Sequence, residues 1–410
     1  MVSPRTRFAL LAGRTAGRAS RALGRGAGQQ VSGRIMNRLD PDALRELGTG
    51  RRIAIVSATN GKTTTTALLA AAIAAQGEAV ASNTTGANLA AGCAAALAAN
   101  PDAEWAVLEV DERAVPAVFE ALRPELLVLG NLSRDQLDRY GEVSSIAHRW
   151  RTLLDAHPDT TVVANASDPA VVWAAQPANT TFVDLGLHWR EDSATCPQCG
   201  ALMQWSAHRF DCTACGFAQP DAVATLTDGA LTVDGTRLTL NVALPGRWNE
   251  CNAALAIVAA RALGIRPAHA AAAVASVTTV SGRYATYELG DGRPVRVFLA
   301  KNPAGWSEVL HYLEGSDDGV VLAVNAHIAD GRDPSWLWDV PYELLRGRDV
   351  VAAGERALDV AVRLYYAEVS HRIETDPILA ATLIDADRID IVASYTNFHA
   401  LTRRFGSSAT

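Results

Sequence analysis

The stretch Ile53-Ala-Ile-Val-Ser57, followed by Ala58-Thr59-Asn60-Gly61-Lys62-Thr63-Thr64, decides the fold of this 410-residue chain. A short apolar run, a loop of small residues and an Ala- and Leu-rich segment over 63–76 predict a strand, a turn and a helix. Backbone N–H groups from Asn60 to Thr64, with the positive end of the helix dipole, form a cradle for phosphate anions. In such a loop Gly61 permits close approach of the backbone, Lys62 reaches the β- and γ-phosphates, and the Thr63 hydroxyl binds Mg²⁺.

The loop is not a standard Walker A motif, because Val56 stands where that motif has its first glycine. A chance Gly-Lys-Thr at a helix start is the alternative interpretation. The strand predicted before the loop and the helix predicted after it argue against chance.

Apolar runs continue along the chain in alternation with helical segments. Each run is bounded by polar or turn residues, and they lie at 105–110, 126–129, 161–164, 295–299, 320–324, 350–353 and 389–394. This alternation predicts an α/β fold with parallel sheets covered on both faces. We expect a central domain at 46–280 with an insertion at 191–221, and a second, Rossmann-like α/β domain at 281–410.

A basic segment at 1–45 precedes these domains. The first forty residues carry eight arginines and one acid, Asp40, while the whole chain has a net charge of −7. Arginines interrupt the apolar core that a secretory signal needs. The sequence contains no run of eighteen apolar residues, so we expect no transmembrane helix. Three interpretations remain for the segment: a helix packed on its own protein, a helix against acidic protein or anionic lipid, and a transit peptide.

Four of the six cysteines form two CxxC pairs, Cys196/Cys199 and Cys212/Cys215, with twelve residues between the pairs. A glycine after each second cysteine permits the tight turn that points two sulfurs at one metal, so the spacing predicts a closed, structural Zn²⁺ site. Disulfide bonds and an iron–sulfur cluster are the alternative interpretations. This cysteine usage is typical of a reducing cytosol rather than of a disulfide-bonded secreted protein. Nucleic-acid binding is poorly supported, because Arg209 is the one basic residue between Cys196 and Cys215.

Several motifs in order resemble those of Mur ligases and folylpolyglutamate synthetases. The Thr-Asn-Gly-Lys-Thr-Thr-Thr form of the loop is their signature, 131–141 is similar to their N-[IL]-x-x-D-H-L-D-x-[HY]-G motif, and 246–254 is similar to G-x-[HF]-N-x-x-N-A-x-A. Ser281-Gly282-Arg283 resembles the Gly-Arg that opens their C-terminal domain. The resemblance implies ATP and Mg²⁺ as cofactors and a ligase that activates a carboxylate as an acyl phosphate.

The resemblance also implies roles for particular residues. Glu109, at the end of a predicted strand, would bind Mg²⁺, and a carboxylate there faces the crevice where open α/β sheets bind ligands. A solvated acid at the strand end is the competing interpretation, and it fits Asp111 or Glu112 better. Asn249 and Asn252 would lie near the adenine, and Arg283 would contact nucleotide phosphate.

Two departures from the family leave the second Mg²⁺ site open. Gln136 replaces the usual histidine, and the helix expected over 143–156 lacks the lysine that many Mur ligases carbamylate. His148 and Arg149 occupy roughly that region.

The cysteine insertion and the loop from Asn325 to Asp339 are similar to those of the MurT family. That resemblance implies amidation of the D-glutamate α-carboxylate in the lipid II stem peptide, with ammonia from a partner glutaminase of the GatD type. An aspartate of this chain would complete the partner's triad; Asp333 is favoured, Asp339 is next, and Asp330 is expected near the nucleotide. The expected location is the cytoplasm or the inner face of the membrane.

Two rival functions remain, the second from another class of protein. A stand-alone Mur or folylpolyglutamate-type ligase would act without a partner, but would leave the cysteine insertion and the tryptophan-rich loop unexplained. A non-enzymatic zinc-ribbon protein with a decayed ATPase core is disfavoured by the intact Lys62, Thr63 and Glu109.

Overall fold

The computed structural model of the chain describes residues 3–22, 29–83, 86–135, 143–186, 189–206, 209–280 and 282–408. The chain divides into two units. The first comprises Met1–Leu132 and Val143–Thr278, and the second comprises Ser133–Glu142 and Thr279–Thr410. Gln136 and Ser281, named above, lie outside the described residues.

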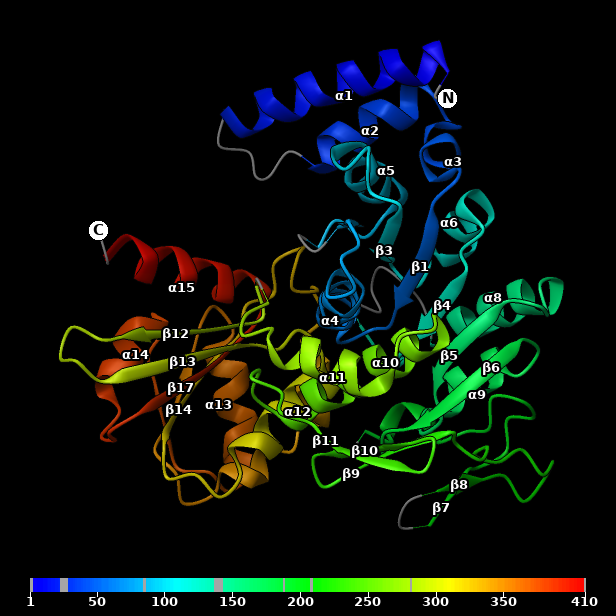
Figure 1. Cartoon of the computed structure of the whole chain (residues 1–410). Helices are drawn as coiled ribbons and strands as arrows, with labels where there is room; N and C mark the ends of the chain where they lie inside the picture. The colour runs from blue at the N-terminus through cyan, green and yellow to red at the C-terminus, as the bar shows by residue number, and fades with distance from the viewer. Residues whose placement is uncertain are drawn as a thin grey trace. The chain divides into compact units, whose positions relative to one another are not determined.

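A nine-stranded sheet forms the centre of the first unit (Figure 1), in the order β11-β10-β9-β6-β5-β4-β1-β3-β2. Neighbours from β2 to β9 are parallel, whereas β10 is antiparallel to both β9 and β11. The parallel sheet predicted from the sequence is therefore confirmed. The strands are β1 (Arg52–Ser57), β2 (Val80–Ser82), β3 (Trp105–Glu109), β4 (Leu126–Leu129), β5 (Thr161–Asn165), β6 (Asn179–Asp184), β9 (Ala224–Thr227), β10 (Ala230–Val233) and β11 (Thr236–Thr239).

Helices cover both faces of this sheet. Alternate residues of a strand point to opposite faces, so Ile53 and Ile55 enter one core while Ala54 and Val56 enter the other. The second core is closed by α4 (Lys62–Ala74), α10 (Arg247–Ala262) and α11 (Pro267–Ala275). The first is closed by α2 (Gln29–Leu39), α3 (Ala43–Gly48), α5 (Ala90–Ala99), α6 (Val115–Leu122), α8 (Val143–Ala156) and α9 (Pro169–Ala175).

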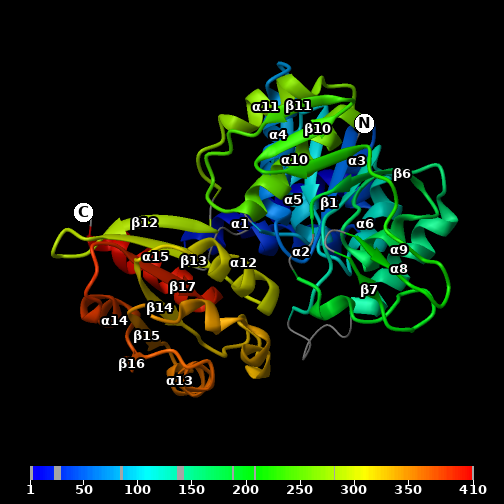
Figure 2. The same ribbon diagram turned by 90° about the horizontal axis from the view of Figure 1, so that it is seen from below.

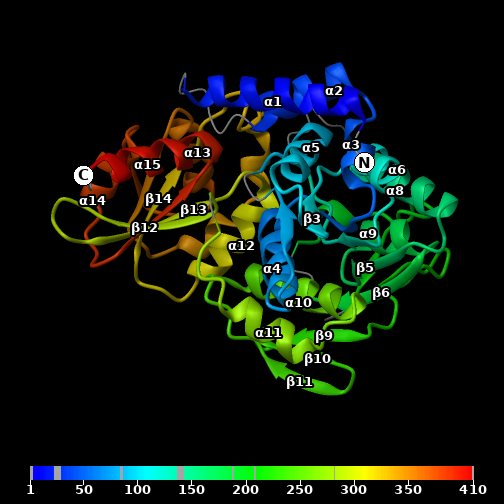
Figure 3. The ribbon, with the colours of Figure 1, turned by 45° about the horizontal axis from the view of Figure 1, so that its top comes forward.

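The basic N-terminal segment folds onto this unit. Helix α1 (Pro4–Ala22) packs along α2, and α2 packs on α5 (Figure 3). The contact between α2 and α5 is close, since a Cβ atom at Gly33 would lie 1.8 Å from the carbonyl oxygen of Ala91. Packing on its own protein is therefore correct for the described part of the segment. None of the helices in the described ranges is both long enough and apolar enough to cross a membrane.

A six-stranded sheet forms the second unit, in the order β12-β13-β17-β14-β15-β16 (Figure 2). Only β12 is antiparallel to its neighbour. Its elements are β12 (Tyr284–Glu288), β13 (Pro294–Leu299), α12 (Pro303–Leu313), β14 (Gly319–Ala323), the 3₁₀ turns η2 (Ser335–Asp339) and η3 (Tyr342–Leu345), β15 (Val350–Ala353), α13 (Ala357–Tyr366), β16 (His371–Ile373), α14 (Pro377–Leu383), β17 (Ile389–Ala393) and α15 (Tyr395–Ser408). Helices α14 and α15 share one core with the sheet.

Candidate active site

The loop between β1 and α4 has the geometry of a phosphate-binding turn. Gly61 precedes the helix with φ of 85°, in the left-handed region that favours glycine. A Cβ atom at this position would lie 2.1 Å from Oδ1 of Asn252, so the loop also needs a residue without a side chain. Gly61, the N-cap residue of α4, has no side chain with which to cap the helix. The first turn of the helix therefore presents its N–H groups where an anion is favoured.

Asn131, which follows β4, holds the loop in this conformation. Its Oδ1 accepts from the N–H of Asn60 at 2.9 Å, and its Nδ2 donates to the carbonyl oxygen of Asn60 at 2.9 Å. The N–H of Thr59 donates to the carbonyl of Asn131 at 2.8 Å. This role was not predicted from the sequence, although Asn131 opens one of the motifs.

Lys62 is buried at the start of α4, and its ammonium meets three acceptors. Nζ donates to the carbonyl oxygens of Ala58 and Thr59, and it pairs with Oε2 of Glu112 at 3.0 Å. The two side chains are 5% and 9% exposed. The interpretation of Glu112 as a solvated acid was therefore wrong. The backbone beyond β3 turns this carboxylate inward. Trp150 anchors that backbone, because its Nε1 donates to the main-chain carbonyl of Glu112 at 2.8 Å.

Thr63 and Glu109 form the second half of the site. Oγ1 of Thr63 lies 2.8 Å from Oε2 of Glu109, and Nδ2 of Asn88 lies 3.3 Å from Oε1. Glu109 is 1% exposed. Asn83 fixes its backbone, because the Glu109 N–H donates to Oδ1 of Asn83 at 2.7 Å and Nδ2 of Asn83 donates back at 2.8 Å. The carboxylate predicted at this strand end thus points to the hydroxyl predicted to share its metal.

Asn249 and Asn252 lie in the first two turns of α10, behind the loop. Oδ1 of Asn252 accepts from Oγ1 of Thr65 at 3.2 Å, and Nδ2 of Asn252 donates to Oδ1 of Asn249 at 3.3 Å. Nδ2 of Asn249 donates to the carbonyl of Pro245 at 2.6 Å. Both side chains are buried, and Asn249 holds Asn252, which lies against Thr65 of α4 and Gly61 of the loop. Their expected contact with adenine remains a prediction.

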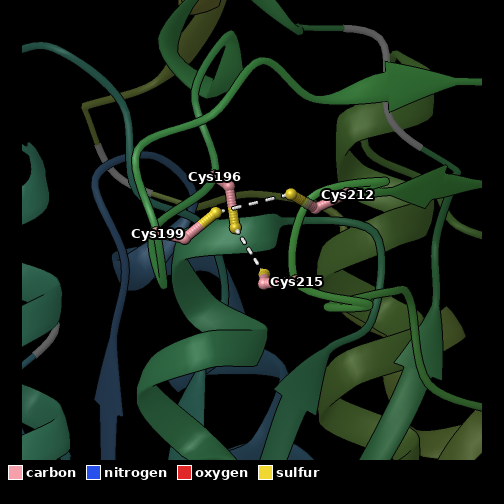
Figure 4. Close-up of side chains that lie close together, drawn as sticks. All are labelled: Cys196, Cys199, Cys212 and Cys215. Carbon is pink, nitrogen blue, oxygen red and sulfur yellow. Dashed lines mark hydrogen bonds between the residues drawn. The ribbon is translucent and has the colours of Figure 1, made fainter.

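The four cysteines of the insertion converge on one point (Figure 4). Their sulfurs all lie within 4.8 Å of one another, with Cys196 and Cys215 at 3.7 Å and Cys199 and Cys212 at 3.6 Å. These separations exclude disulfide bonds, in which sulfurs are about 2.05 Å apart. They match the spacing of about 3.8 Å between ligands in a tetrahedral site with Zn–S bonds of about 2.3 Å.

The two knuckles repeat the same backbone pattern. Gly200 and Gly216 have φ of 77° and 73°, and their N–H groups donate to the carbonyls of Cys196 and Cys212 at 2.9 Å. The short strands β7 (Gln204–Trp205) and β8 (Phe210–Asp211) join the knuckles, and a 3₁₀ turn η1 (Glu191–Ser193) precedes them. Phe210 and Phe217 place the ribbon against the core that covers one face of the large sheet.

Three acids of the second unit have different surroundings. Asp330 is buried; Oδ1 accepts from the N–H of Thr396 at 2.8 Å and Oδ2 from its hydroxyl at 2.6 Å. Asp339 pairs with Arg134 at 2.9 Å. Asp333 is exposed, and the N–H of Ser335, 2.9 Å away, holds the pKa of its carboxyl below the usual value.

These acids line a pocket of the second unit together with Lys301 and Trp336. Lys301 pairs there with Asp135, at 2.6 Å. Arg283 lies just before β12. Its contact with nucleotide phosphate remains a prediction. His148 and Arg149 are exposed on α8, with the His148 ring 4.6 Å from that of Trp173.

The sequence matches two family descriptions: the Mur ligase middle domain over residues 56–260 and the MurT ligase C-terminal over residues 299–398. It is 31% identical, over 86% of each chain, to the lipid II isoglutaminyl synthase (glutamine-hydrolyzing) subunit MurT of Staphylococcus aureus (strain N315). The chain belongs to the MurT family of Mur ligases. The subunit of the same name from Streptococcus pneumoniae (strain ATCC BAA-255 / R6) is 29% identical over 88% of this chain and 86% of its own.

Solved structures of two other ligases share the fold of this MurT-family chain. A pseudomurein peptide ligase type C from Methanothermus fervidus superimposes with a TM-score of 0.70 at 16% identity, covering 88% of this chain and 79% of its own. The folylpolyglutamate synthase of Mycobacterium tuberculosis, solved with ADP, gives 0.63 at 16% identity, covering 89% and 92%. The Mur ligase fold predicted from the motifs is therefore confirmed.

Proposed function

We propose that this chain is the synthase subunit of a lipid II isoglutaminyl synthase, which uses ATP to amidate the D-glutamate α-carboxylate of the stem peptide to D-isoglutamine. The observation that carries the proposal is the pairing of Thr63 with Glu109 beside the Lys62 loop, in a chain whose relatives bear that activity in their names. Such a site provides what phosphoryl transfer needs, which is positioning and charge stabilisation.

The reaction has two steps in this proposal. A carboxylate oxygen of the substrate attacks the γ-phosphorus of ATP, and the bond from that phosphorus to the β–γ bridging oxygen breaks. The products are ADP and the acyl phosphate of the substrate. Ammonia then attacks the acyl carbon, and phosphate departs with the bond's electron pair while the nitrogen loses a proton. In the first step the N–H groups of Gly61 to Thr64 and the Lys62 ammonium hold the phosphate oxygens.

The residues present fit a magnesium ion. Adjacent ligands of an octahedral Mg²⁺ with bonds of about 2.1 Å are about 3 Å apart, and the Thr63 and Glu109 oxygens are separated by 2.8 Å. These two residues would hold the ion, which when bound neutralises negative charge on the phosphates. The four cysteine sulfurs would likewise hold Zn²⁺, in a closed site with a structural role.

Ammonia in this proposal comes from glutamine, hydrolysed by a separate glutaminase subunit of the GatD type. Asp333 would orient and stabilise the partner's catalytic histidine, because it is the exposed acid of its loop while Asp339 is paired and Asp330 is buried. Asp330 has both carboxylate oxygens occupied by this chain's own donors, which favours a structural role over the proposed nucleotide contact.

A partner surface close in sequence to that loop supports the two-subunit proposal. Leu358, Val362 and Tyr365, spaced as one face of α13, are 70%, 51% and 74% exposed. Trp338 of η2 is 54% exposed, and its ring centroid lies 5.4 Å from that of Tyr366. Contiguous exposed apolar surface is a feature of protein interaction sites.

The test is an amidation assay with amide-¹⁵N glutamine, ATP and lipid II, with this chain alone, the glutaminase alone, or both. Label entering the stem peptide as an amide only with both proteins is the expected result, read by mass spectrometry. Attachment of a whole amino acid by this chain alone would instead identify a stand-alone ligase. A third sample with ammonium chloride in place of glutamine separates the synthase step from the glutaminase step.

A further inference from the structure

Helix α1 exposes an apolar strip with arginines along its sides. Phe8 and Leu11 are 64% and 66% exposed. At 100° per residue they project from the side of the helix away from its packed face. Arg7 and Arg18 are exposed on one edge of this strip. Arg5 lies on the other edge; its side chain is 65% exposed, although its Nε donates to the Leu39 carbonyl at 2.9 Å and lies 3.9 Å from Asp40. We call Arg5, Arg7, Phe8, Leu11 and Arg18 the α1 outer face.

The opposite side of α1 is fully used by the protein's own packing. Thr6, Ala9, Gly13, Gly17 and Ser20 are buried and are all small, so α1 lies close to α2. A Cβ atom at Gly13 would meet Cγ of Met36 at 2.6 Å. The outer face is therefore not a core face that awaits another part of this unit.

The start of α1 is tied to the unit by polar contacts. Oε2 of Glu46 accepts from the N–H of Ser3 at 2.8 Å, and the single O–H of Thr6 is shared between Oε2 of Glu46, 2.8 Å away, and the Asp40 carboxylate. The outer face is thus presented on an anchored helix. Helix α2 adds a similar stripe, in which Val31, Arg34 and Arg38 are exposed.

Charge identifies the class of partner. Eight arginines and one acid occupy the first forty residues of a chain whose net charge is −7. An exposed apolar strip with arginines along its edges fits the interface of an anionic bilayer, where the apolar side chains enter the acyl boundary and the arginines meet lipid phosphates. An acidic protein surface would match the arginines but would leave Phe8 and Leu11 without a complementary environment.

We propose that the α1 outer face binds an anionic lipid surface and holds this chain at the membrane as a peripheral protein. This inference goes beyond the proposed amidation and does not depend on it, because the helix is built from residues outside the candidate active site. Lipid binding can be measured with no ATP and no lipid II present.

The experiment is flotation of the full chain with vesicles made of equal parts phosphatidylglycerol and phosphatidylcholine, compared with phosphatidylcholine alone. We expect binding to the anionic vesicles only. Arg7→Gln/Arg18→Gln should lower the partition constant by about five-fold per arginine. Phe8→Ser/Leu11→Ser should lower it by about ten-fold or more per side chain. Raising the salt to about 1 M shortens the Debye length to about 3 Å and should remove the contribution of the arginines.

Matched controls keep loss of binding separate from loss of folding. Leu358→Ser/Tyr365→Ser removes two equally exposed apolar side chains from α13 and should leave vesicle binding unchanged. Both α1 variants should unfold at the wild-type temperature, since the substituted side chains are exposed. A deletion of residues 1–38 is a poorer test, because it removes the buried Met36 and uncovers α5.

Failure of the wild-type chain to bind anionic vesicles at low salt would overturn the proposal. Equal binding by the wild type and the two α1 variants would overturn it as well. Retention on immobilised poly-glutamate without vesicle binding would assign the face to an acidic protein instead. None of these outcomes changes the amidation assay, so the two proposals fail or stand separately.

Discussion

Lys62 and Glu112 form a buried ion pair at the phosphate loop, with Nζ and Oε2 3.0 Å apart. The ammonium also donates to the carbonyls of Ala58 and Thr59, within the same loop. An ammonium has three N–H donors, and these three acceptors match that number. A bound phosphate must therefore compete with Glu112 for Lys62.

Glu112→Gln should tighten ADP binding, because it removes the carboxylate that competes with phosphate. The same change leaves a buried ammonium without its partner, so the empty protein should lose about 3–5 kcal/mol of stability. Saturating Mg²⁺-ADP should restore much of that loss. Calorimetric titration and thermal unfolding with and without nucleotide measure both effects.

The matched control is Glu125→Gln, which breaks the exposed Arg52–Glu125 pair, also in the first unit. It should cost less than about 1 kcal/mol and leave ADP affinity unchanged. Weaker ADP binding by Glu112→Gln would show instead that Glu112 holds Lys62 toward the phosphate.

Gly61→Ala should abolish ATP turnover and destabilise the first unit. The alanine would have to adopt φ of 85°, and its Cβ atom would lie 2.1 Å from Oδ1 of Asn252. Gly77→Ala is the control, because Gly77 has φ of 90° but nothing within 4 Å of the added Cβ. Gly77→Ala should cost about 1–2 kcal/mol from backbone conformation alone. Equal effects in the two variants, measured by denaturant unfolding and phosphate release, would contradict the close approach of Asn252.

The pH dependence of stability should carry a signature of Asp168. Burial raises the pKa of this carboxyl to about 6, although it accepts from the N–H groups of Leu132, Ala170 and Val171. A folded-state pKa above the unfolded value of about 4 means that the folded state binds the extra proton. Its contribution to stability is therefore present below pH about 4 and is lost as the pH rises through about 6.

Asp168→Asn should remove that slope from the difference curve between about pH 4 and 6. Asp376→Asn is the control, and its effect on the pH dependence of stability should have the opposite sign. Asp376 caps the start of α14 as Asp168 caps the start of α9. Burial tends to raise the pKa of Asp376, but Arg404 and the N–H groups of Leu379 and Ile378 lower it overall. Its contribution is lost as the pH falls. Identical pH profiles for the two variants would contradict both assignments.

Zinc should co-purify with the chain in a one-to-one ratio and should leave when a thiolate ligand is removed. Cys212→Ser should lose the metal and unfold the ribbon, because a tetrahedral site needs all four sulfurs. Cys251→Ser, which removes a cysteine outside the ribbon, should keep full zinc content. Elemental analysis of both variants, with limited proteolysis of 191–221, decides the matter.

Asp333→Asn should reduce glutamine-driven amidation by as much as about four orders of magnitude, since an amide cannot stabilise the histidine cation of the partner. Amidation driven by ammonium chloride should be unchanged, because that reaction bypasses the glutaminase. Asp339→Asn, which breaks the pair with Arg134, serves as the comparison. If Asp339→Asn alone abolished the glutamine-driven reaction, the triad role would belong to Asp339.

Secondary structure and the cysteine cluster could be predicted from short stretches of sequence. The apolar runs predicted β4 and β15 with their observed limits, and 143–156 was predicted as the helix now seen as α8. Cysteine spacing predicted the converging sulfurs of the ribbon. These features depend on residues close in sequence, through side-chain periodicity and turn conformation, so one segment contains what is needed to predict them.

The competition for Lys62 could not be predicted in the same way. Asp111 and Glu112 are adjacent and chemically alike, and only the path of the backbone after β3, anchored by Trp150, turns Glu112 toward Lys62. Likewise Asn252, distant in sequence from Gly61, excludes a side chain there because α10 packs on α4. Among Asp330, Asp333 and Asp339, the sequence shows three similar acids, whereas folding buries one, pairs another and exposes the third. The sequence by itself determined the motifs and their chemistry; burial and partnership depend on distant residues, so the tertiary structure decided which side chains are available to act.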